Sequence, residues 1–262
     1  MKVGRAAPMG VSVAAPRCPV LGSDCFCGEP EDAAALLLAR ARSRAGGYAC
    51  FCNVHVVVSA LHDPRLRDSL SDAWMLFPDG APVAWLQRRS GNAQACRIAG
   101  PDTMPRVIAL GRPLGLRHYL LGATDDVLGR LRGRIEEELS GRVVGCASPR
   151  IADPSADAGE LVETIRKTEP DIVWCALGAP KQELWMQANA PRLVPALLLG
   201  VGAAFDFLAG TKRRAPDYVQ RLGLEWLHRL ASEPRRLTGR YLRTNTEFVL
   251  RAALELTRSP LR

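Results

Sequence analysis

The chain has 262 residues, which allows one large domain or two small ones at ~100–200 residues per domain. Apolar residues make up 47% and charged residues 24%, an ordinary globular composition that excludes wholesale disorder. No apolar run approaches the ~20 residues that a membrane-spanning helix needs, and the N-terminus shows no apolar segment typical of a signal peptide.

The elements expected from the sequence alternate between short apolar strands and helical patterns. Residues 1–17 are rich in Ala, Pro and Gly and are predicted to be disordered. In chain order we then expect a strand at 17–24, a helix at 31–45, a strand at 48–53, helices at 55–61 and 64–71, a strand at 73–77, helices at 81–89 and 101–112, a strand at 117–122, a helix at 125–140, a strand at 142–147, a helix at 156–168, a strand at 171–177, a helix from Lys181 and a strand at 195–201. This order predicts an α/β fold with a Rossmann-like, mainly parallel sheet flanked by helices.

The pattern changes at about residue 210. From there the sequence shows basic amphipathic helices interrupted near Pro234, so we expect a catalytic body at 18–209 and a C-terminal appendage at 210–262. The net charge of the whole chain is +8. Residues 210–262 include 12 basic and 5 acidic residues, so this segment alone has a net charge of +7. An appendage at +7 on a nearly neutral body indicates an anionic partner, such as nucleic acid, lipid headgroups or a phosphorylated substrate. A basic helix that is merely solvated is the alternative.

The cysteines and histidines argue against metal and disulfide chemistry. No two of the eight cysteines form a CxxC motif, the spacing that is typical of a structural zinc site. Cys25 and Cys27, like Cys50 and Cys52, are two residues apart and would share one face of a strand, so we expect buried, reduced thiols. The four histidines show no HxxxH or HxH spacing. We therefore expect neither a catalytic metal nor a cofactor.

Candidate site residues follow the predicted strands. In parallel sheets ligands bind beyond the carboxyl ends of the strands. The loops at Asn53, Asp79, Gly122, Gly178 and Gly202 should therefore meet along one edge. Asp79 in the turn Pro-Asp-Gly is placed to act as a general base, although Asp before Gly is also a common turn former.

The segment GAPKQE at 178–183 lies between a strand and a helix. The free amides of that helix start, with Lys181 and Gln182, predict an anion or nucleotide site, and a simple helix cap is the alternative. Gly200 and Gly202 lack the third glycine of a dinucleotide fingerprint, since Phe205 stands in its place. Hydride transfer is therefore disfavoured, and the absence of a GxSxG turn disfavours a hydrolase of that type.

An ordered set of motifs resembles one known family. The motifs are FPDG at 77–80, RIAG at 97–100, LGAPKQELW at 177–185, GVGAAFDFLAG at 200–210, RAP at 214–216, GLEWLHRL at 223–230 and EPRR at 233–236. Together they resemble the WecG/TagA/CpsF glycosyltransferases, glycosyltransferase family 26, over residues 18–242.

The resemblance implies an activity and its partners. It implies an inverting, metal-independent transfer of a sugar from a UDP-sugar to a polyprenyl-diphosphate-linked saccharide, in bacterial surface polysaccharide biosynthesis. The enzyme would be a cytoplasmic protein, peripheral on the inner face of the cell membrane, and a homo-oligomer is compatible with this picture. A lipid-linked substrate also agrees with the charged appendage, because basic amphipathic helices lie on anionic membranes at ~1 kcal/mol per cation near the surface.

The resemblance also assigns roles to residues. It implies catalytic roles for Asp79 as the general base, and for Asn53 and Arg97. The nucleotide-sugar side would be formed by Gly178, Pro180, Lys181, Gln182, Glu183, Gly202 and Asp206. The acceptor diphosphate would be held by Arg214, Arg229, Arg236 and Arg240. One position departs from the family: Phe51 stands where members often carry a threonine, which bears on the donor sugar.

Two other classes of function stay open at this point. A nucleic-acid-binding protein could use the basic appendage, but its Leu and Trp spacing indicates an apolar face, and no aromatic-basic binding module is present, so we expect no nucleic acid partner. A nucleotide-binding regulator without catalysis is the second alternative, and Phe51 keeps it open.

Overall fold

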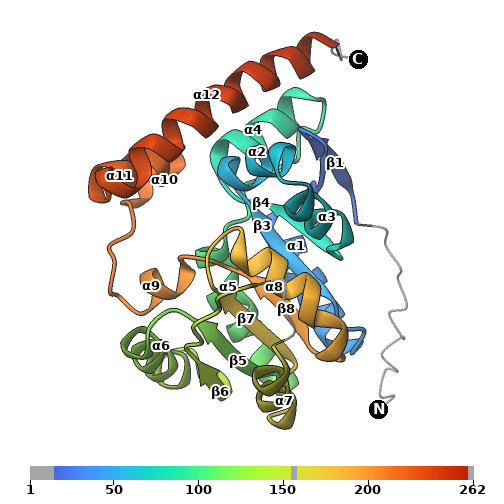
Figure 1. Cartoon of the computed structure of the whole chain (residues 1–262), viewed down its shortest axis with the longest axis vertical. Coiled ribbons are helices and arrows are strands. Elements are labelled where there is room, and N and C mark those ends of the chain that lie inside the picture. Colours follow the sequence, from blue (N-terminus) through green and yellow to red (C-terminus); the bar gives the residue numbers. More distant parts are fainter. Residues whose placement is uncertain (1–14, 155–157, 259–262) are drawn as a thin grey trace, which may run out of the picture.

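An eight-stranded sheet forms the centre of the molecule, in the order β1-β2-β4-β3-β8-β7-β5-β6 (Figure 1). This is a computed structural model that describes residues 15–154 and 158–258. β1 and β2 pair antiparallel and the remaining neighbours pair parallel, which confirms the predicted α/β class. The strands are β1 (Arg17–Val20), β2 (Ser23–Phe26), β3 (Tyr48–Cys52), β4 (Met75–Pro78), β5 (Arg117–Gly122), β6 (Arg142–Ala147), β7 (Ile172–Ala176) and β8 (Leu197–Gly200).

Helices cover both faces of the sheet. Residues of α2 (Val54–His62), α3 (Pro64–Asp72), α4 (Ala81–Arg89), α7 (Gly159–Lys167) and α8 (Lys181–Asn189) belong to one buried cluster. Residues of α1 (Pro30–Arg42), α5 (Gly100–Gly111), α6 (Asp125–Glu137) and α9 (Ala204–Leu208) belong to the other. Short 3₁₀ helices follow α5 (Arg112–Leu114) and α8 (Ala190–Arg192). Strand β3 faces both clusters, since Cys50 and Cys52 point into the first and Phe51 into the second, as the period of two requires.

The N-terminal prediction needs two corrections. The strand expected at 17–24 is a hairpin, in which β1 and β2 are joined by Leu21 and Gly22. Both residues have positive φ, 49° and 84°, which is the conformation of a tight two-residue hairpin turn. The segment predicted to be disordered ends earlier than residue 17, because Arg17 pairs with Phe26 in β1. Residues 1–14 of that segment lie outside the described residues.

All eight cysteines are free thiols, and six of them are buried. Cys50 and Cys52 share one face of β3, as their spacing predicts. Desolvation raises the pKa of the buried Cys50 and Cys175 thiols, which keeps them protonated. These thiols therefore fill the core as small apolar residues.

Three helices make up the C-terminal appendage: α10 (Asp217–Arg221), α11 (Glu225–Ser232) and α12 (Pro234–Arg258). The predicted interruption at Pro234 is confirmed, since α12 begins there. Helix α12 crosses the body beside α2 (Figure 1), and its Phe248 and Ala252 are buried in the same cluster as α2. His62 Nε2 lies 2.7 Å from Glu247 Oε1 at this contact. The appendage thus shares its core with the body.

The carboxyl ends of four parallel strands lie level with one another. Cys52 of β3 is in register with Pro78 of β4, and Gly200 of β8 is in register with both Cys50 and Cys175. The loops that follow these strands therefore begin at the same edge of the sheet, where ligands of such folds bind.

Candidate active site

A cavity of about 230 Å³ opens at this edge, between the body and the appendage. The loops after β3, β4, β7 and β8 line one side of it, and helices α11 and α12 line the other. Of the predicted site residues it brings together Asn53, Asp79, Arg97, Gly178, Gln182, Gly202 and Arg229. Gly122 ends β5 farther along the edge, and the loop after it lines a neighbouring pocket instead.

Asp79 is held directly after β4. Its backbone N–H donates to Cys52 O at 3.0 Å, and Gly80 follows with φ of 110°, a conformation that favours glycine. Desolvation raises the pKa of Asp79 to about 6, with Arg97 and Arg229 opposing that shift and Glu225 and Asp102 adding to it. A carboxylate with a pKa close to neutral in a cavity is suited to accept a proton.

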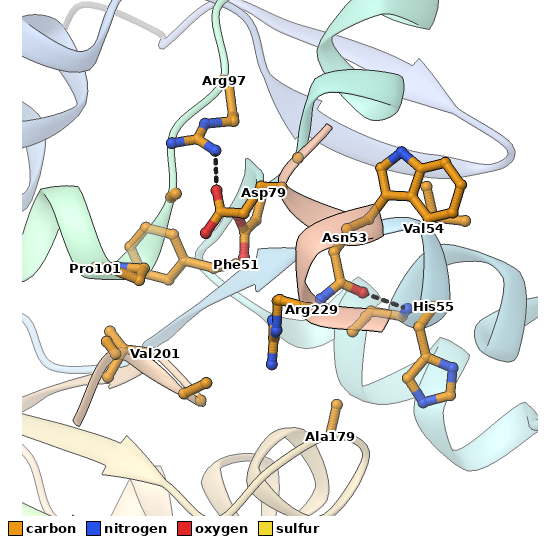
Figure 2. A pocket seen from close by; sticks show the side chains of 18 of the residues that line it. Phe51, Asn53, Val54, His55, Asp79, Arg97, Pro101, Ala179, Val201 and Arg229 are labelled. Atoms are coloured by element: carbon orange, nitrogen blue, oxygen red, sulfur yellow. Dashed lines mark hydrogen bonds and ion pairs between the residues drawn. The ribbon is translucent and has the colours of Figure 1, made fainter. Parts of the chain in front are cut away.

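Asn53 caps helix α2 and faces the cavity at the same time. Its side-chain Oδ1 accepts a hydrogen bond from Val56 N at 3.2 Å. The amide nitrogen of Asn53 is directed to the cavity side, between Asp79 and His55 (Figure 2). This side chain can therefore donate hydrogen bonds to a ligand without giving up the cap.

The two arginines Arg97 and Arg214 are engaged by carboxylates. Arg97 Nη2 lies 2.8 Å from Asp102 Oδ2, and its Nη1 donates to Glu225 Oε2. Arg214 contacts the same two acids, with Nε 3.2 Å from Glu225 Oε1 and Nη2 2.8 Å from Asp102 Oδ2. Arg97 lines the cavity and Arg214 does not.

Arg229 differs from these arginines. It reaches the cavity from α11, and its guanidinium carbon lies 5.7 Å from the ring centroid of Phe207. Among the described residues no carboxylate forms an ion pair with it. Arg229 is thus a cation available to an anionic ligand. Arg236 and Arg240 belong to helix α12, and their side chains lie outside the described part of the structure.

The residues predicted for the nucleotide side separate into two groups. Gly178, Gln182 and Gly202 line the cavity, whereas Pro180, Lys181, Glu183 and Asp206 do not. Successive residues of α8 point in different directions, so Lys181 is exposed and Glu183 is fully buried in the core. Asp206 lines a neighbouring pocket, where its carboxylate lies 3.6 Å from Lys212 Nζ.

Gln182 is fixed by its neighbours. Its Nε2 donates to Gly200 O at 3.1 Å and to Glu183 Oε1 at 2.8 Å. Burial raises the pKa of Glu183 to about 7, and the bond from Gln182 lowers it in part. Oε1 of Gln182 has no hydrogen-bond partner among the described residues, so its acceptor capacity is unused in this structure.

Phe51 forms part of the cavity wall. Its ring stacks on Phe77 with centroids 5.2 Å apart and planes 29° apart. The wall at this position is therefore apolar, where the resemblance implies a threonine hydroxyl group.

Several lining residues were not predicted as site residues from the sequence, notably Glu225, Trp226, Tyr241 and Asn245. All four come from the appendage, where Trp226 packs edge-on against Tyr241 with ring centroids 6.2 Å apart. The segment GLEW at 223–226 belongs to one of the family motifs, and this was the sequence feature that could have marked Glu225 and Trp226 as site residues. The pairing of α11 with the body gave it a place in the cavity.

Two features are absent from the described residues. Within residues 15–154 and 158–258 no group of three or more His, Cys, Asp or Glu could hold a metal ion. In the same ranges no helix is both long and apolar enough to cross a membrane.

The parallel sheet with a charged cavity at its carboxyl edge defines an α/β protein whose cavity lies where such folds bind their ligands. The model of one family, described as the glycosyl transferase WecG/TagA/CpsF family, matches residues 18–261. The chain belongs to this family of glycosyltransferases.

Proposed function

We propose that the protein is an inverting glycosyltransferase that moves a sugar from a UDP-sugar to a polyprenyl-diphosphate-linked saccharide, in the synthesis of a bacterial surface polysaccharide. Family membership supports the transfer of a sugar, and the cavity at the sheet edge supports the mechanism. The single observation that carries the mechanism is Asp79, a carboxylate with a raised pKa that faces two arginines across this cavity.

The reaction would proceed as one displacement. Asp79 accepts the proton of the acceptor hydroxyl while that oxygen bonds to the anomeric carbon of the donor sugar. The bond from this carbon to the phosphate oxygen breaks at the same time, and UDP leaves with the electron pair. Because one attack replaces one leaving group, the anomeric configuration inverts.

Cations would stabilise the departing UDP. The resemblance implied that Arg229 holds the acceptor diphosphate; we propose instead that it stabilises the departing UDP, because it lines the cavity and no described carboxylate neutralises it. Guanidinium groups bind phosphate oxygens in pairs. Arg97 would contribute through its positive electrostatic potential and not by direct contact, since it acts on Asp79 but is paired with Glu225 and Asp102. We propose that these arginines take the part that a metal ion plays in metal-dependent transferases.

The appendage would bring the enzyme to its lipid-linked acceptor. Large apolar side chains are exposed along α10 to α12, among them Tyr218, Leu222, Leu242, Val249 and Leu250. Exposed arginines, including Arg221 and Arg243, accompany them. Basic helices with exposed apolar residues bind anionic bilayer surfaces. We therefore propose that residues 18–209 form the catalytic body and that 210–262 bind the cytoplasmic membrane face and the acceptor.

The activity itself can be tested with purified protein. A set of UDP-sugars is incubated with a short-chain polyprenyl-diphosphate saccharide, and released UDP is measured alongside the anomeric configuration of the product by NMR. We expect UDP release to depend on the acceptor with at least one donor, and the product to be inverted. Retention of configuration would contradict the single displacement. Binding of UDP without any transfer would favour a nucleotide-binding regulator.

Membrane binding should depend on the exposed apolar residues in and directly after α10. We expect Tyr218→Ser with Leu222→Ser to reduce binding to anionic liposomes by about tenfold or more, because two large side chains no longer enter the interface. Co-sedimentation measures this loss. Leu110→Ser with Leu114→Ser is the matched control, since these residues are exposed on the body. Equal losses in both variants would contradict the assignment of the membrane surface.

A further inference from the structure

An ion-pair cluster joins the body to the appendage beside the cavity. Its members are Arg97 in the loop before α5, Asp102 in the first turn of α5, Arg214 in the segment before α10, and Glu225 in the first turn of α11. Two positive and two negative charges make it neutral. The side chains of Arg97, Arg214 and Glu225 are only 21%, 20% and 18% exposed, so salt screens them less than surface pairs.

Glu225 connects α11 both to Arg97, in the loop before α5, and to Arg214, in the segment before α10. Its Oε2 accepts from Arg97 and its Oε1 lies 3.2 Å from Arg214 Nε, so one carboxylate bridges two guanidinium groups. The chain separation is 128 residues in the first contact and 11 in the second. Charge-assisted bonds of this kind are roughly twice as strong as neutral ones.

Apolar burial contributes little to holding α11 in place. No residue of α10 or α11 is fully buried. Helix α11 also packs against its neighbours α10 and α12. Its aromatic contacts are the stacking of Arg229 over Phe207 and the edge-on contact of Trp226 with Tyr241. A helix without a buried apolar face depends on its polar contacts for its position.

We propose that Glu225 is a positioning residue for the transfer: by bridging Arg97 and Arg214 it docks helix α11, and so brings Arg229 into the cavity opposite Asp79. This inference rests on the proposed function. Glu225 lines the cavity, but in our proposal it acts through the two arginines that it bridges and needs no contact with substrate.

The bridge also sets the charge around Asp79. The charged groups that act on Asp79 are Arg97 from the loop before α5, Asp102 from α5, and Glu225 and Arg229 from α11. His55 of α2 lines the same cavity. Glu225 and Asp102 raise the pKa of Asp79 and thereby offset the arginines, which would otherwise make this carboxylate a weaker base.

The test compares Glu225→Gln with Glu136→Gln, a matched control in an exposed pair with Arg132 on α6. Hydrogen exchange of residues 217–232 is measured without substrate, and the pH profile of kcat/KM is measured with it. We expect Glu225→Gln to speed exchange in this segment at least fivefold, with the sheet unchanged. We also expect it to lower kcat/KM by about 10- to 100-fold. The acid limb should move to lower pH, because the lost charge of Glu225 acts more strongly on the pKa of Asp79 than the withdrawn Arg229, which acts in the opposite direction. The control should match the wild type in each measurement.

Arg214→Gln removes the bridge from its other end and leaves Asp79 and Arg97 in place. If both variants act through one bridge, the double variant should lose no more activity than Glu225→Gln alone. Wild-type exchange in Glu225→Gln would overturn the docking role. Faster exchange with wild-type activity and an unmoved acid limb would overturn the positioning role. The exchange measurement needs no sugar donor, so failure of the bridge is distinguishable from failure of the proposed function.

Discussion

Asp79→Asn should lower the turnover of sugar transfer by ~10²–10⁴-fold, the usual contribution of a general base. Asparagine has the shape of the carboxylate but cannot accept the proton of the acceptor hydroxyl. Affinity for UDP should stay within about threefold, because the diphosphate contacts that we propose come from the arginines. Steady-state kinetics and calorimetric titration with UDP measure the two quantities.

The pH dependence gives a second measure of the same role. Burial raises the pKa of Asp79 to about 6, so below this pH the side chain is protonated and cannot act as a base. The kcat/KM of the wild type should therefore rise with pH up to about 6, and the residual activity of Asp79→Asn should lack this limb. Near-normal turnover in the variant would contradict the assignment.

The melting temperature of Asp79→Asn distinguishes a loss of catalysis from a loss of folding. A carboxyl whose pKa is raised in the folded state destabilises the protein above that pKa, where folding must bury the charge. Asp79→Asn removes this cost, so its melting temperature at pH 7.5 should equal or exceed that of the wild type. Asp68→Asn, at an exposed position on α3, is the matched control and should change neither activity nor stability.

Arg229→Ala should lower kcat by ~10²–10³-fold, the range found when one group that stabilises developing charge is removed. The reason is that Arg229 lines the cavity and no described carboxylate neutralises it, so the charge that develops on UDP would lose its available cation. Because Arg229 also lowers the pKa of Asp79, the acid limb of the pH profile should move to higher pH. This shift is opposite in sign to the one expected for Glu225→Gln.

The control for Arg229 is another arginine of the appendage. Arg243→Ala removes the same charge from an exposed position on α12 and should leave kcat unchanged on a water-soluble acceptor. An equal loss in both variants would indicate a general effect of net charge, and a full kcat in Arg229→Ala would remove this residue from the mechanism.

The positions of Asn53, Asp79, Gln182 and Gly202 at one edge of the sheet followed from the sequence. Each lies one to a few residues beyond a strand end or just after a strand-to-helix turn, and these patterns are local. Parallel strands in register then bring the loops together without further information. The family motifs added the kind of reaction to be expected, and the match over residues 18–261 confirmed the family.

The sequence could not tell which of the arginines is already paired with a carboxylate and which is available to a ligand. Arg97, Arg214 and Arg229 all occur in family motifs, and nothing in their sequence context says which is already neutralised. Asp206 and Lys181 likewise occur in motifs, but the first lines another pocket and the second faces solvent. Their roles at the nucleotide stay predictions.

The sequence by itself thus determined the α/β fold, the edge of the sheet at which the cavity lies, and a carboxylate that lines the cavity, because strand ends and turns depend on neighbouring residues. Only the tertiary structure decided which arginine of the cavity has no carboxylate partner among the described residues. Arg97 meets Glu225 across 128 residues of chain, and Arg214 meets Asp102 across 112. The partner of a side chain over such distances depends on how whole helices pack, and a short sequence pattern carries no information about that packing.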